Sequence, residues 1–448
     1  MPNYTTYKPH NEISTIVRRQ LMLPADSSLI HRDADLPGLA VLLNVDAFAA
    51  ALQVELPEIN IQSIRSTYVR YKRGTNCLVA YELNVAGTKV PIYAKAFGAN
   101  SWNKLQKYRN EISVPGSLGV GRLILAAYGI AVCFFPNDRD LKQLPQLVDQ
   151  QTRKHLLHKM SATDLYETQL LNLRYKPERR YVGQLRTDTN IQAVVKAYTT
   201  EDYLQAKTNA QAFHSGTVLH IAPTLGYSDG DRLLAFEWIS RLPLHEAIAQ
   251  PQFNYDAVTL TGAALAEVHA QNPANLNVLS RNAEAQSLLS MAADLSFICP
   301  PIADLAQNLA KQFAQELRSL PQLTYPIHGD FNAEQVLLGE NNVTFLDFDR
   351  AVRSDPAADL GSFIARLEHD KLRGNLSLYR LERIKEALLQ SYPTSFLYNR
   401  IELYTAIALF RLACEPFRYR EPNWHEKTAA ILQQVETILQ PLSTPQSA

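Results

Sequence analysis

Three carboxylates and one amide lie within a single stretch of the sequence, residues 328–350, where they could do chemistry together. Asp330 and Gln335 precede a predicted β-hairpin, and Asp347 and Asp349 follow it. Like charges gathered in this way repel one another, and a bound cation relieves the repulsion. Oxygen ligands suit Mg²⁺, which takes the rest of its coordination shell from water and from a substrate phosphate. The stretch therefore predicts phosphoryl transfer at a magnesium site.

Two short strands are expected to position these side chains. Apolar runs at 336–338 and 343–346 flank the turn-forming residues 339–342, which predicts a tight hairpin. Because a hairpin brings its two ends together, the three carboxylates and the amide are expected at one mouth. Taken singly, each aspartate could equally cap a turn or lie at the polar edge of a strand.

The motifs His328-Gly329-Asp330 and Leu346-Asp347-Phe348-Asp349, with Gln335 between them, resemble the paired signature of the aminoglycoside phosphotransferase and choline kinase family. That resemblance implies a protein-kinase-like fold with ATP and Mg²⁺ as cofactors. It also implies that Asp330 orients or deprotonates an acceptor hydroxyl, that Asp347 holds Mg²⁺ on the nucleotide phosphates, and that His328 orients the catalytic loop.

One position departs from the family. Members usually have a metal-binding Asn where this chain has Gln335, which keeps the carbonyl oxygen on a stem one methylene longer. Asp349 is expected either to contact the metal or to orient the loop, and both roles stay open. The segment 355–361 also resembles the family, in which an Asp starts a helix and tethers the catalytic loop. Asp359 is predicted to be an N-cap rather than a reactive group.

Composition narrows the possible partners and location. The chain has 448 residues with 44 Lys and Arg against 44 Asp and Glu, a balance that argues against nucleic acid or an anionic membrane as partner. The four cysteines form no Cys-x-x-Cys pair, which favours buried thiols in a reducing compartment. The sequence lacks a secretory signal and any run of about 18 apolar residues. A cytoplasmic protein is expected.

Four segments are expected along the chain, and the predicted fold class is α+β. They are a helical segment at 1–58, a β-rich repeat resembling a kinase N-lobe at 59–160, a nucleotide-binding N-lobe with its hinge at 161–240, and a helical C-lobe with the catalytic loop and acceptor pocket at 241–448. The whole is a kinase-like bilobal fold preceded by an extra N-lobe-like domain.

Helical spacing of apolar residues in the first segment predicts helices at 12–22 and 36–56. Asp33 and Asp35 are candidate starts of the second helix. No chemistry is predicted for this segment, which is expected to pack against the rest.

The two β-rich segments carry the same pattern about 100 residues apart, which predicts a duplicated lobe. Lys95 lies in Tyr-Ala-Lys-Ala-Phe and Lys196 in Val-Val-Lys-Ala-Tyr, and residues 233–238 echo residues 130–135. In the kinase-like fold one strand lysine contacts the nucleotide phosphates. Because the second lobe leads directly into the helical region, Lys196 is predicted to be that lysine and Lys95 its retired counterpart.

The residues Phe236, Glu237 and Trp238 resemble the hinge where backbone groups of the family meet adenine. In this fold the lysine is commonly held by a helical glutamate. Glu111 follows Lys95 at a suitable spacing, whereas the helix predicted after Lys196 has no late glutamate.

The turn 177–180, where a phosphate-covering loop is expected, contains no glycine. Its backbone amides cannot approach phosphate as those of a glycine-rich loop do, and Arg179 or Arg180 could supply charge instead. The favoured interpretation of the two arginines is a solvated basic turn. No G-x-x-x-x-G-K-[ST] motif occurs, which excludes the P-loop class of nucleotide-binding proteins.

The leading hypothesis is an ATP- and Mg²⁺-dependent phosphotransferase acting on a hydroxyl of a small molecule such as an aminoglycoside, a sugar or an amino alcohol. The alternative is a catalytically weak or inactive kinase-like regulatory protein that binds a nucleotide or a small molecule. A metal-dependent phosphohydrolase ranks last, because the extra histidine ligands that such sites recruit are missing. A cluster at 415–424, containing Glu415, Arg418 and Trp424, could line the acceptor pocket or form surface ion pairs.

Overall fold

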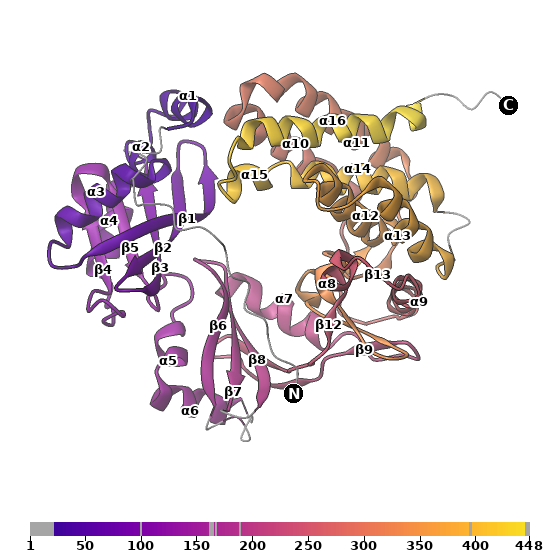
Figure 1. Ribbon diagram of the computed structural model, residues 1–448, viewed down its shortest axis with the longest axis horizontal. Helices are drawn as coiled ribbons and strands as arrows, with labels where there is room; N and C mark the ends of the chain where they lie inside the picture. Colours follow the sequence, from indigo (N-terminus) through magenta and orange to yellow (C-terminus); the bar gives the residue numbers. More distant parts are fainter. Residues whose placement is uncertain are drawn as a thin grey trace.

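The computed structural model describes residues 22–98, 101–160, 165, 168–187, 190–393 and 397–443. The helix predicted at 12–22 falls outside these residues except for its last position. Two five-stranded sheets are followed by a largely helical part, so the predicted α+β class is confirmed (Figure 1).

The chain enters through three short helices, α1 (Pro24–Arg32), α2 (Leu39–Leu43) and α3 (Val45–Glu55). The single helix predicted at 36–56 is wrong, because Asn44 is extended and its side chain accepts a hydrogen bond from Ala47 N at 3.1 Å, which starts a new helix. Asp33 is not a helix start either. Its buried carboxylate accepts hydrogen bonds from the hydroxyl of Tyr71 and from Gly74 N.

The first sheet has the strand order β1-β2-β3-β5-β4, with every neighbouring pair antiparallel. Its strands are β1 (Ile61–Lys72), β2 (Asn76–Val85), β3 (Thr88–Phe97), β4 (Arg122–Leu125) and β5 (Ile130–Phe134). Helices α2 and α3 cover one face, where Phe48 stacks on Tyr81 with ring centroids 4.2 Å apart. The other face packs against α4 (Trp102–Asn110) through buried side chains that include Leu105 and Tyr108.

The second sheet has the equivalent order, β6-β7-β8-β11-β10. Its strands are β6 (Gln169–Lys176), β7 (Arg180–Arg186), β8 (Ile191–Tyr198), β10 (Thr224–Ser228) and β11 (Leu233–Glu237), and α7 (Thr200–Ala210) follows its third strand as α4 follows the third strand of the first sheet. A separate apolar core lies between this sheet and the helices α5 (Leu144–Val148) and α6 (Gln150–Lys159). The shared topology agrees with the predicted repeat, and an origin by duplication remains a prediction.

The helical part is held together by two small sheets and nine helices among the residues the structure describes. The sheets are β12-β14-β15-β9, formed by Leu242–Pro243, Val336–Leu338, Val343–Phe345 and Leu219–Ile221, and β13-β16, formed by Tyr325–Ile327 and Val352–Ser354. The helices are α8 (Leu244–Ala249), α9 (Asp256–Ala270), α10 (Arg281–Ile298), α11 (Ala303–Ser319), α12 (Ala357–Leu372), α13 (Leu378–Gln390), α14 (Tyr398–Leu412), α15 (Glu415–Arg418) and α16 (Trp424–Ser443).

Helix α10 was not predicted from the sequence. Its many alanine and serine residues do not separate into one apolar and one polar face, so its sequence lacks a strong helical period. Packing against α11 buries one side of it all the same. Across the described residues, no helix has both the length and the apolar character needed to cross a membrane.

The first sheet touches the helical part as well as the second sheet, so the three parts surround the middle of the molecule (Figure 1). Buried Asp26 of α1 accepts hydrogen bonds from Arg420 at 2.6 and 3.0 Å and from the indole of Trp424 at 3.2 Å. Arg32 donates to the carbonyl oxygen of Phe297 at the end of α10. Polar contacts therefore join the first helix to the start of α16, the last helix, and to the end of α10.

Replacing Asp26 with Asn is expected to lower the free energy of unfolding by about 3 kcal/mol, because Arg420 then stays buried without a counter-charge. Urea unfolding followed by tryptophan fluorescence measures this. Asp35→Asn, which changes an exposed aspartate close by, is the matched control. Equal urea midpoints for the two variants would contradict the assigned role of Asp26.

Candidate functional site

The catalytic loop predicted at His328-Gly329-Asp330 follows β13 and is tied to helix α12 by one buried carboxylate. Asp359 accepts hydrogen bonds from His328 N at 2.7 Å and Gly329 N at 2.9 Å. The N-cap prediction for Asp359 is wrong, because α12 begins at Ala357 and Asp359 lies inside its first turn. The tether that the resemblance implied is present.

Asp359 has a third partner that the sequence did not indicate. His269 of α9 approaches it with Nε2 at 3.0 Å and meets the hydroxyl of Tyr392 through Nδ1 at 2.6 Å. Burial raises the pKa of Asp359, but the contacts with His269 and His328 outweigh burial and hold the pKa below its usual value. These contacts give His269 a structural role in holding Asp359.

A glycine is needed at position 329, because the chain passes very close to the backbone of Arg350 there. The φ of Gly329, +80°, lies in the left-handed region, and a Cβ at this position would meet the carbonyl oxygen of Arg350 at 2.2 Å. The ring of fully buried His328 contacts the carbonyl oxygen of Leu346 through Nε2 at 2.7 Å. His328 therefore orients the loop against the strand that leads to Asp347, and it faces no open space.

Asp330 is the accessible carboxylate of the site. Its side chain is 45% exposed, and its ion-pair partner among the described residues is Arg350, with Nε at 3.9 Å. An exposed carboxylate with such a loose partner is available to a ligand.

The predicted hairpin is confirmed. Strands β14 and β15 are antiparallel, and the carbonyl oxygen of Gln335 accepts a hydrogen bond from Leu346 N at 2.9 Å, so the two ends meet as expected. Asp347 follows in the left-handed region at φ 63°, a conformation that costs a non-glycine residue free energy. This turn directs Asp347 and Asp349 toward the second sheet.

Asp347 and Asp349 share two cations from the second sheet. Lys196 Nζ lies 2.6 Å from Asp347 and 3.2 Å from Asp349. Arg180 meets Asp347 with two nitrogens, at 3.0 and 3.1 Å, and also contacts Asp349. Burial raises the pKa of Asp347, but Lys196 and Arg180 outweigh burial and hold it far below its usual value.

The prediction that three carboxylates gather at one mouth is wrong. In the part of the chain that the structure describes, no three His, Cys, Asp or Glu side chains come together in a way that could hold one metal ion. Asp330 lies apart from Asp347 and Asp349, because the left-handed turn at Asp347 sends the later pair toward Lys196.

Arg180 was misjudged as part of a solvated turn. It opens β7 and reaches the carboxylates of the helical part, whereas Arg179 is exposed as expected. Arg180 lies directly opposite Lys176 in the ladder of β6 and β7.

Asn209 of α7 is a second residue that sequence reasoning missed. Its amide nitrogen donates to the carbonyl oxygens of Phe348 at 3.1 Å, Asp349 at 3.1 Å and Ala351 at 2.9 Å. The helix after Lys196 therefore holds the backbone of the carboxylate segment, and Lys196 itself pairs with the carboxylates. Glu111 does not hold Lys95 and pairs instead with Arg122 at 2.7 Å.

The predicted hinge lies at the end of β11. The Phe236 ring is 5.2 Å from Lys196 Nζ, on the same face of the sheet. Glu237 N donates to Pro223 O at 2.9 Å and Trp238 N donates to Gln192 O at 3.2 Å. The backbone amides of Glu237 and Trp238 are therefore already hydrogen-bonded inside the lobe. A nucleotide base would have to bond to carbonyl oxygens of the hinge or to residues after Trp238. Glu237 and Trp238 border a hollow of about 490 Å³.

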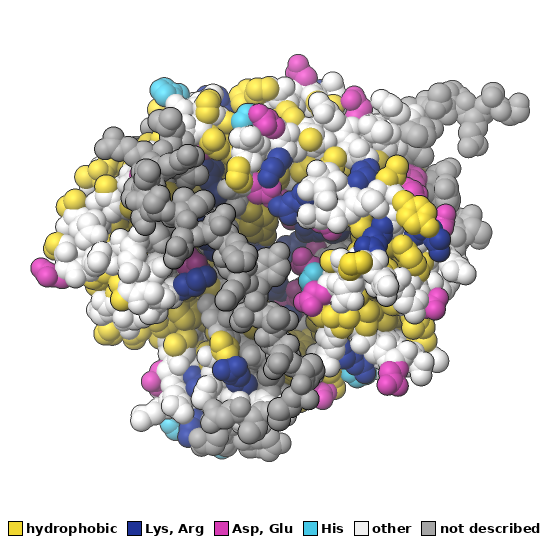
Figure 2. Space-filling model, in the orientation of Figure 1, with side chains coloured by type: hydrophobic (Ala, Val, Ile, Leu, Met, Phe, Trp, Pro, Cys, Tyr) yellow, Lys and Arg dark blue, Asp and Glu magenta, His cyan; other side chains and the backbone are white. Residues whose placement is uncertain are grey.

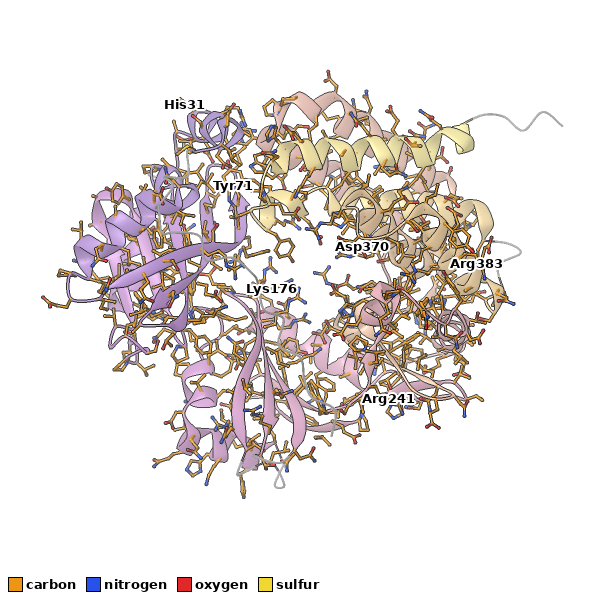
Figure 3. The ribbon with its side chains drawn as sticks, in the orientation of Figure 1. His31, Tyr71, Lys176, Arg241, Asp370 and Arg383 are labelled. Carbon is orange, nitrogen blue, oxygen red and sulfur yellow. The ribbon has the colours of Figure 1, made fainter. Side chains whose placement is uncertain are left out.

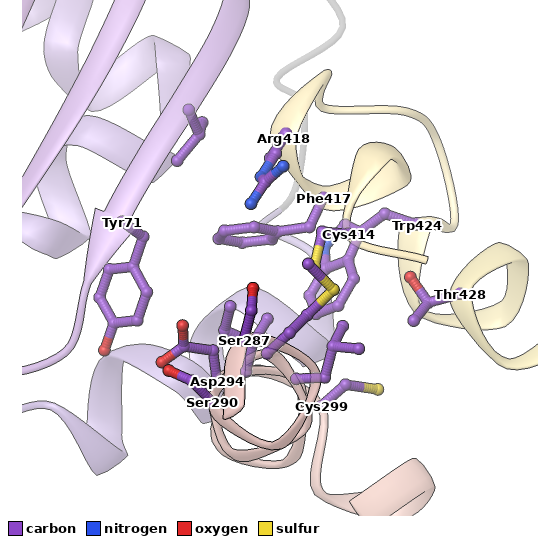
Figure 4. A pocket seen from close by; sticks show the side chains of 14 residues that line it. Tyr71, Ser287, Ser290, Asp294, Cys299, Cys414, Phe417, Arg418, Trp424 and Thr428 are labelled. Carbon is purple, nitrogen blue, oxygen red and sulfur yellow. The ribbon is translucent and has the colours of Figure 1, made fainter. Parts of the chain in front are cut away.

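The cluster at 415–424 divides between two roles. Glu415 pairs with Arg366 at 2.9 Å. Arg418 and Trp424 line a cavity of about 290 Å³ between β1 and helices α10, α15 and α16. Figure 4 shows that cavity, with Tyr71 on one side and Phe417 and Cys414 on the other.

Lys176, at the end of β6, faces the middle of the molecule (Figure 3). Burial and repulsion by nearby arginines lower its pKa to about 8. These arginines are Arg174, Arg180 and Arg350. The ion pairs of the described residues do not include Lys176, and Figure 2 shows Lys and Arg side chains beside acidic ones around the central hollow of this face.

The donor set fits a Mg²⁺ ion shared with a nucleotide. Asp347 and Asp349 offer carboxylate oxygens, and Gln335 lies next to them at the meeting of the hairpin ends. Carboxylate and amide oxygens are the hard donors that Mg²⁺ takes, and in this structure Lys196 and Arg180 neutralise the two carboxylates.

A model of the phosphotransferase enzyme family, APH, matches residues 173–400, slightly more than half of the chain. The match begins inside β6, so it includes the second sheet and excludes the first. None of the curated protein sequences matches this chain.

The solved structures to which this chain is similar include the following three. The choline/ethanolamine kinase family protein from Mesorhizobium loti is 13% identical with a TM-score of 0.46, and the alignment covers 66% of this chain and 95% of that one. Choline kinase LicA from Streptococcus pneumoniae is 13% identical with a TM-score of 0.46, covering 64% and 99%. Aminoglycoside phosphotransferase APH(4)-Ia, in a ternary complex with ADP and hygromycin B, is 11% identical with a TM-score of 0.46, covering 65% and 98%.

Asp359→Asn is expected to lower the free energy of unfolding by about 2 kcal/mol at pH 7, because it removes a charged acceptor from two loop amides and His269. The folded pKa is lowered, so this stabilisation is full above about pH 4, the unfolded value, and is lost as the pH falls through the folded pKa. Unfolding midpoints of the variant and the unaltered chain should therefore converge below pH 4. A constant difference across this range would exclude the charge as the cause.

Lys176→Met is expected to stabilise the ligand-free chain at pH 7, on the order of 1 kcal/mol after allowance for solvent screening. The folded pKa of about 8 lies below the unfolded value. The cost of the charge is therefore full below pH 8 and disappears as the pH rises to about 10.4. Thermal unfolding at pH 7 and pH 10 measures it, with Lys89→Met, at a side chain 72% exposed, as control. Equal melting temperatures for the variant and the unaltered chain at pH 7 would contradict this.

Proposed function

The chain belongs to the phosphotransferase enzyme family, and on that premise we propose that it is an ATP- and Mg²⁺-dependent kinase acting on a hydroxyl of a small molecule. The acceptor class proposed is an aminoglycoside, a sugar or an amino alcohol. The observation that carries the proposal is the division of the carboxylates: Asp330 is accessible, whereas Asp347 and Asp349 face the strand lysine Lys196.

In this proposal Asp330 positions the acceptor hydroxyl and accepts its proton as the acceptor oxygen bonds to the γ-phosphorus of ATP, while the bond from that phosphorus to the bridging oxygen breaks and ADP leaves. Its freedom from close ion pairs leaves the carboxylate able to do so. Asp359 and His328 keep Asp330 in place by holding the backbone on its N-terminal side. The catalysis required of the protein is mainly positioning and charge neutralisation.

The nucleotide is proposed to lie between the second sheet and the carboxylate segment. Positive charge would surround its phosphates, supplied by Lys196 of β8, Arg180 of β7 and Lys176 of β6. Asp347, Asp349 and Gln335 would hold Mg²⁺, which supplies charge neutralisation on the phosphate oxygens when it is bound. The hinge residues Phe236, Glu237 and Trp238 would border the base. This assigns nucleotide binding to the lobe at 161–240 and acceptor binding to the helical part at 241–448.

A second function, regulatory binding without turnover, is favoured by one observation. Lys196 and Arg180 already neutralise Asp347 and Asp349, so a metal ion would have to displace protein cations to bind. Titration with Mg·ATP, followed by a transfer assay over amino sugars, sugars and amino alcohols, separates the two functions. Binding of Mg·ATP without transfer to any acceptor would favour the regulatory function.

Asp330→Ala is expected to reduce phosphotransfer by about 10² to 10⁴-fold, because it removes the proton acceptor. Binding of Mg·ATP should change less than about twofold, since Asp330 lies apart from Lys196 and Asp347. Steady-state rates and calorimetric titration measure the two effects. Glu340→Ala, at an exposed position in the β14–β15 turn, is the control. An equal loss of binding and rate would contradict the role of Asp330.

A further inference from the structure

The turn between β6 and β7 inserts a carboxylate into the first lobe. The Glu178 side chain is 1% exposed and accepts hydrogen bonds from Lys95 Nζ and Arg70 Nη2, each at 2.6 Å, and from the hydroxyl of Tyr108. Lys95 and Arg70 lie on strands of the first sheet and Tyr108 on α4. The position where kinase-like folds have a mobile, glycine-rich loop is thus docked in another lobe.

The backbone of this turn is held as well. Arg70 Nη1 donates to Pro177 O at 3.3 Å, and Glu178 N donates to the buried carboxylate of Asp138 at 2.8 Å. Tyr175, at the end of β6, donates to the same carboxylate at 2.7 Å. Glu178 has a left-handed φ of 54°, which a non-glycine residue keeps only when its surroundings enforce it.

Lys95 occupies the same place in the first sheet as Lys196 in the second, on the third strand and before the helix that follows it. Each lysine meets a carboxylate from the next part of the chain: Lys95 meets Glu178, and Lys196 meets Asp347. A nucleotide phosphate at Lys95 would have to displace a buried, ionised glutamate beside Asp138. In this structure the contact with Glu178 therefore occupies Lys95.

The residues on either side of the docked turn face the proposed active site. Lys176 ends β6, Arg180 begins β7, and the two are paired across the ladder. Arg180 contacts Asp347 and Asp349, and Lys176 feels the charge of Asp330. Because a two-stranded tip is rigid when its turn is fixed, docking Glu178 sets where both cations stand.

We propose that the first lobe is a clamp for the phosphate-covering turn, with Glu178 as a positioning residue that holds Lys176 and Arg180 over the nucleotide phosphates. The inference rests on the proposed function, because it takes the nucleotide site to lie beneath these cations. It gives the extra lobe a role in nucleotide binding without a ligand of its own. A glycine-rich loop contacts phosphate through its backbone amides. This turn instead presents the side-chain cations of Lys176 and Arg180, and the carboxylate of Glu178 sets their positions.

The test is calorimetric titration of the full chain with Mg·AMP-PNP. The unaltered chain is expected to bind one equivalent, and Glu178→Gln and Lys95→Met are each expected to weaken binding about tenfold, since displaced cations lose their alignment with phosphate. The double variant should lose no more than either single one, because both changes release the same contact. Tyr108→Phe removes one hydrogen-bond donor to Glu178 and leaves the ion pair with Lys95, so a smaller loss of affinity, about twofold, is expected. If Glu178→Gln fails to fold, Tyr108→Phe tests the clamp in its place.

Arg65→Met, which removes an exposed ion pair with Glu82 on the same lobe, is the control and should bind like the unaltered chain. Melting temperatures are recorded alongside, because a merely structural role would lower stability in Lys95→Met without changing affinity. Unchanged affinity in the folded Lys95→Met and Tyr108→Phe variants, or two bound equivalents in the unaltered chain, would overturn the clamp and leave the proposed function standing. No binding by the unaltered chain would overturn both.

Discussion

The pairing of Asp347 and Asp349 with Lys196 and Arg180 is the contact on which the arrangement of the site depends. Two carboxylates within reach of one lysine cannot stay ionised and largely buried without opposite charge. The second sheet supplies that charge from two neighbouring strands, and so its position over the helical part is set by electrostatics as well as by apolar packing.

A lysine–carboxylate pair also joins the first sheet to the second. Lys95 on the first sheet meets Glu178 from the second sheet, as Lys196 meets Asp347 from the helical part. Asp26, Arg420 and Trp424 then join the first helix to the last one. Each contact involves a buried carboxylate that would be costly if left alone, so each junction is specific in its partner. The first lobe is consequently fixed at both of its ends.

Backbone polar groups in the segments around Asp330 and Asp347 are satisfied by side chains rather than by regular secondary structure. Asp359 receives the amides of His328 and Gly329, and Asn209 donates to three carbonyl oxygens of the segment after Asp347. Irregular loops with buried backbone groups need such partners. The two anchors come from α12 and α7, so the site is held from the helical part and from the second lobe.

The local elements of the site could be read from the sequence, because their signals are short in range. The hairpin of β14 and β15 follows from apolar runs around a turn. Family motifs further indicated Asp330, Asp347 and Lys196 as residues of interest. Their roles in catalysis and binding remain predictions.

Only the tertiary structure decided which charges meet. The separation of Asp330 from Asp347 depends on one left-handed turn, and the partner of Lys95 lies 83 residues away in another lobe. The same holds for Arg180, which a local pattern assigned to solvent and which long-range attraction brings to Asp347. Residue types and spacing determined the strands and the hairpin. Pairing of charges across lobes has no local signal, because it depends on how the lobes pack.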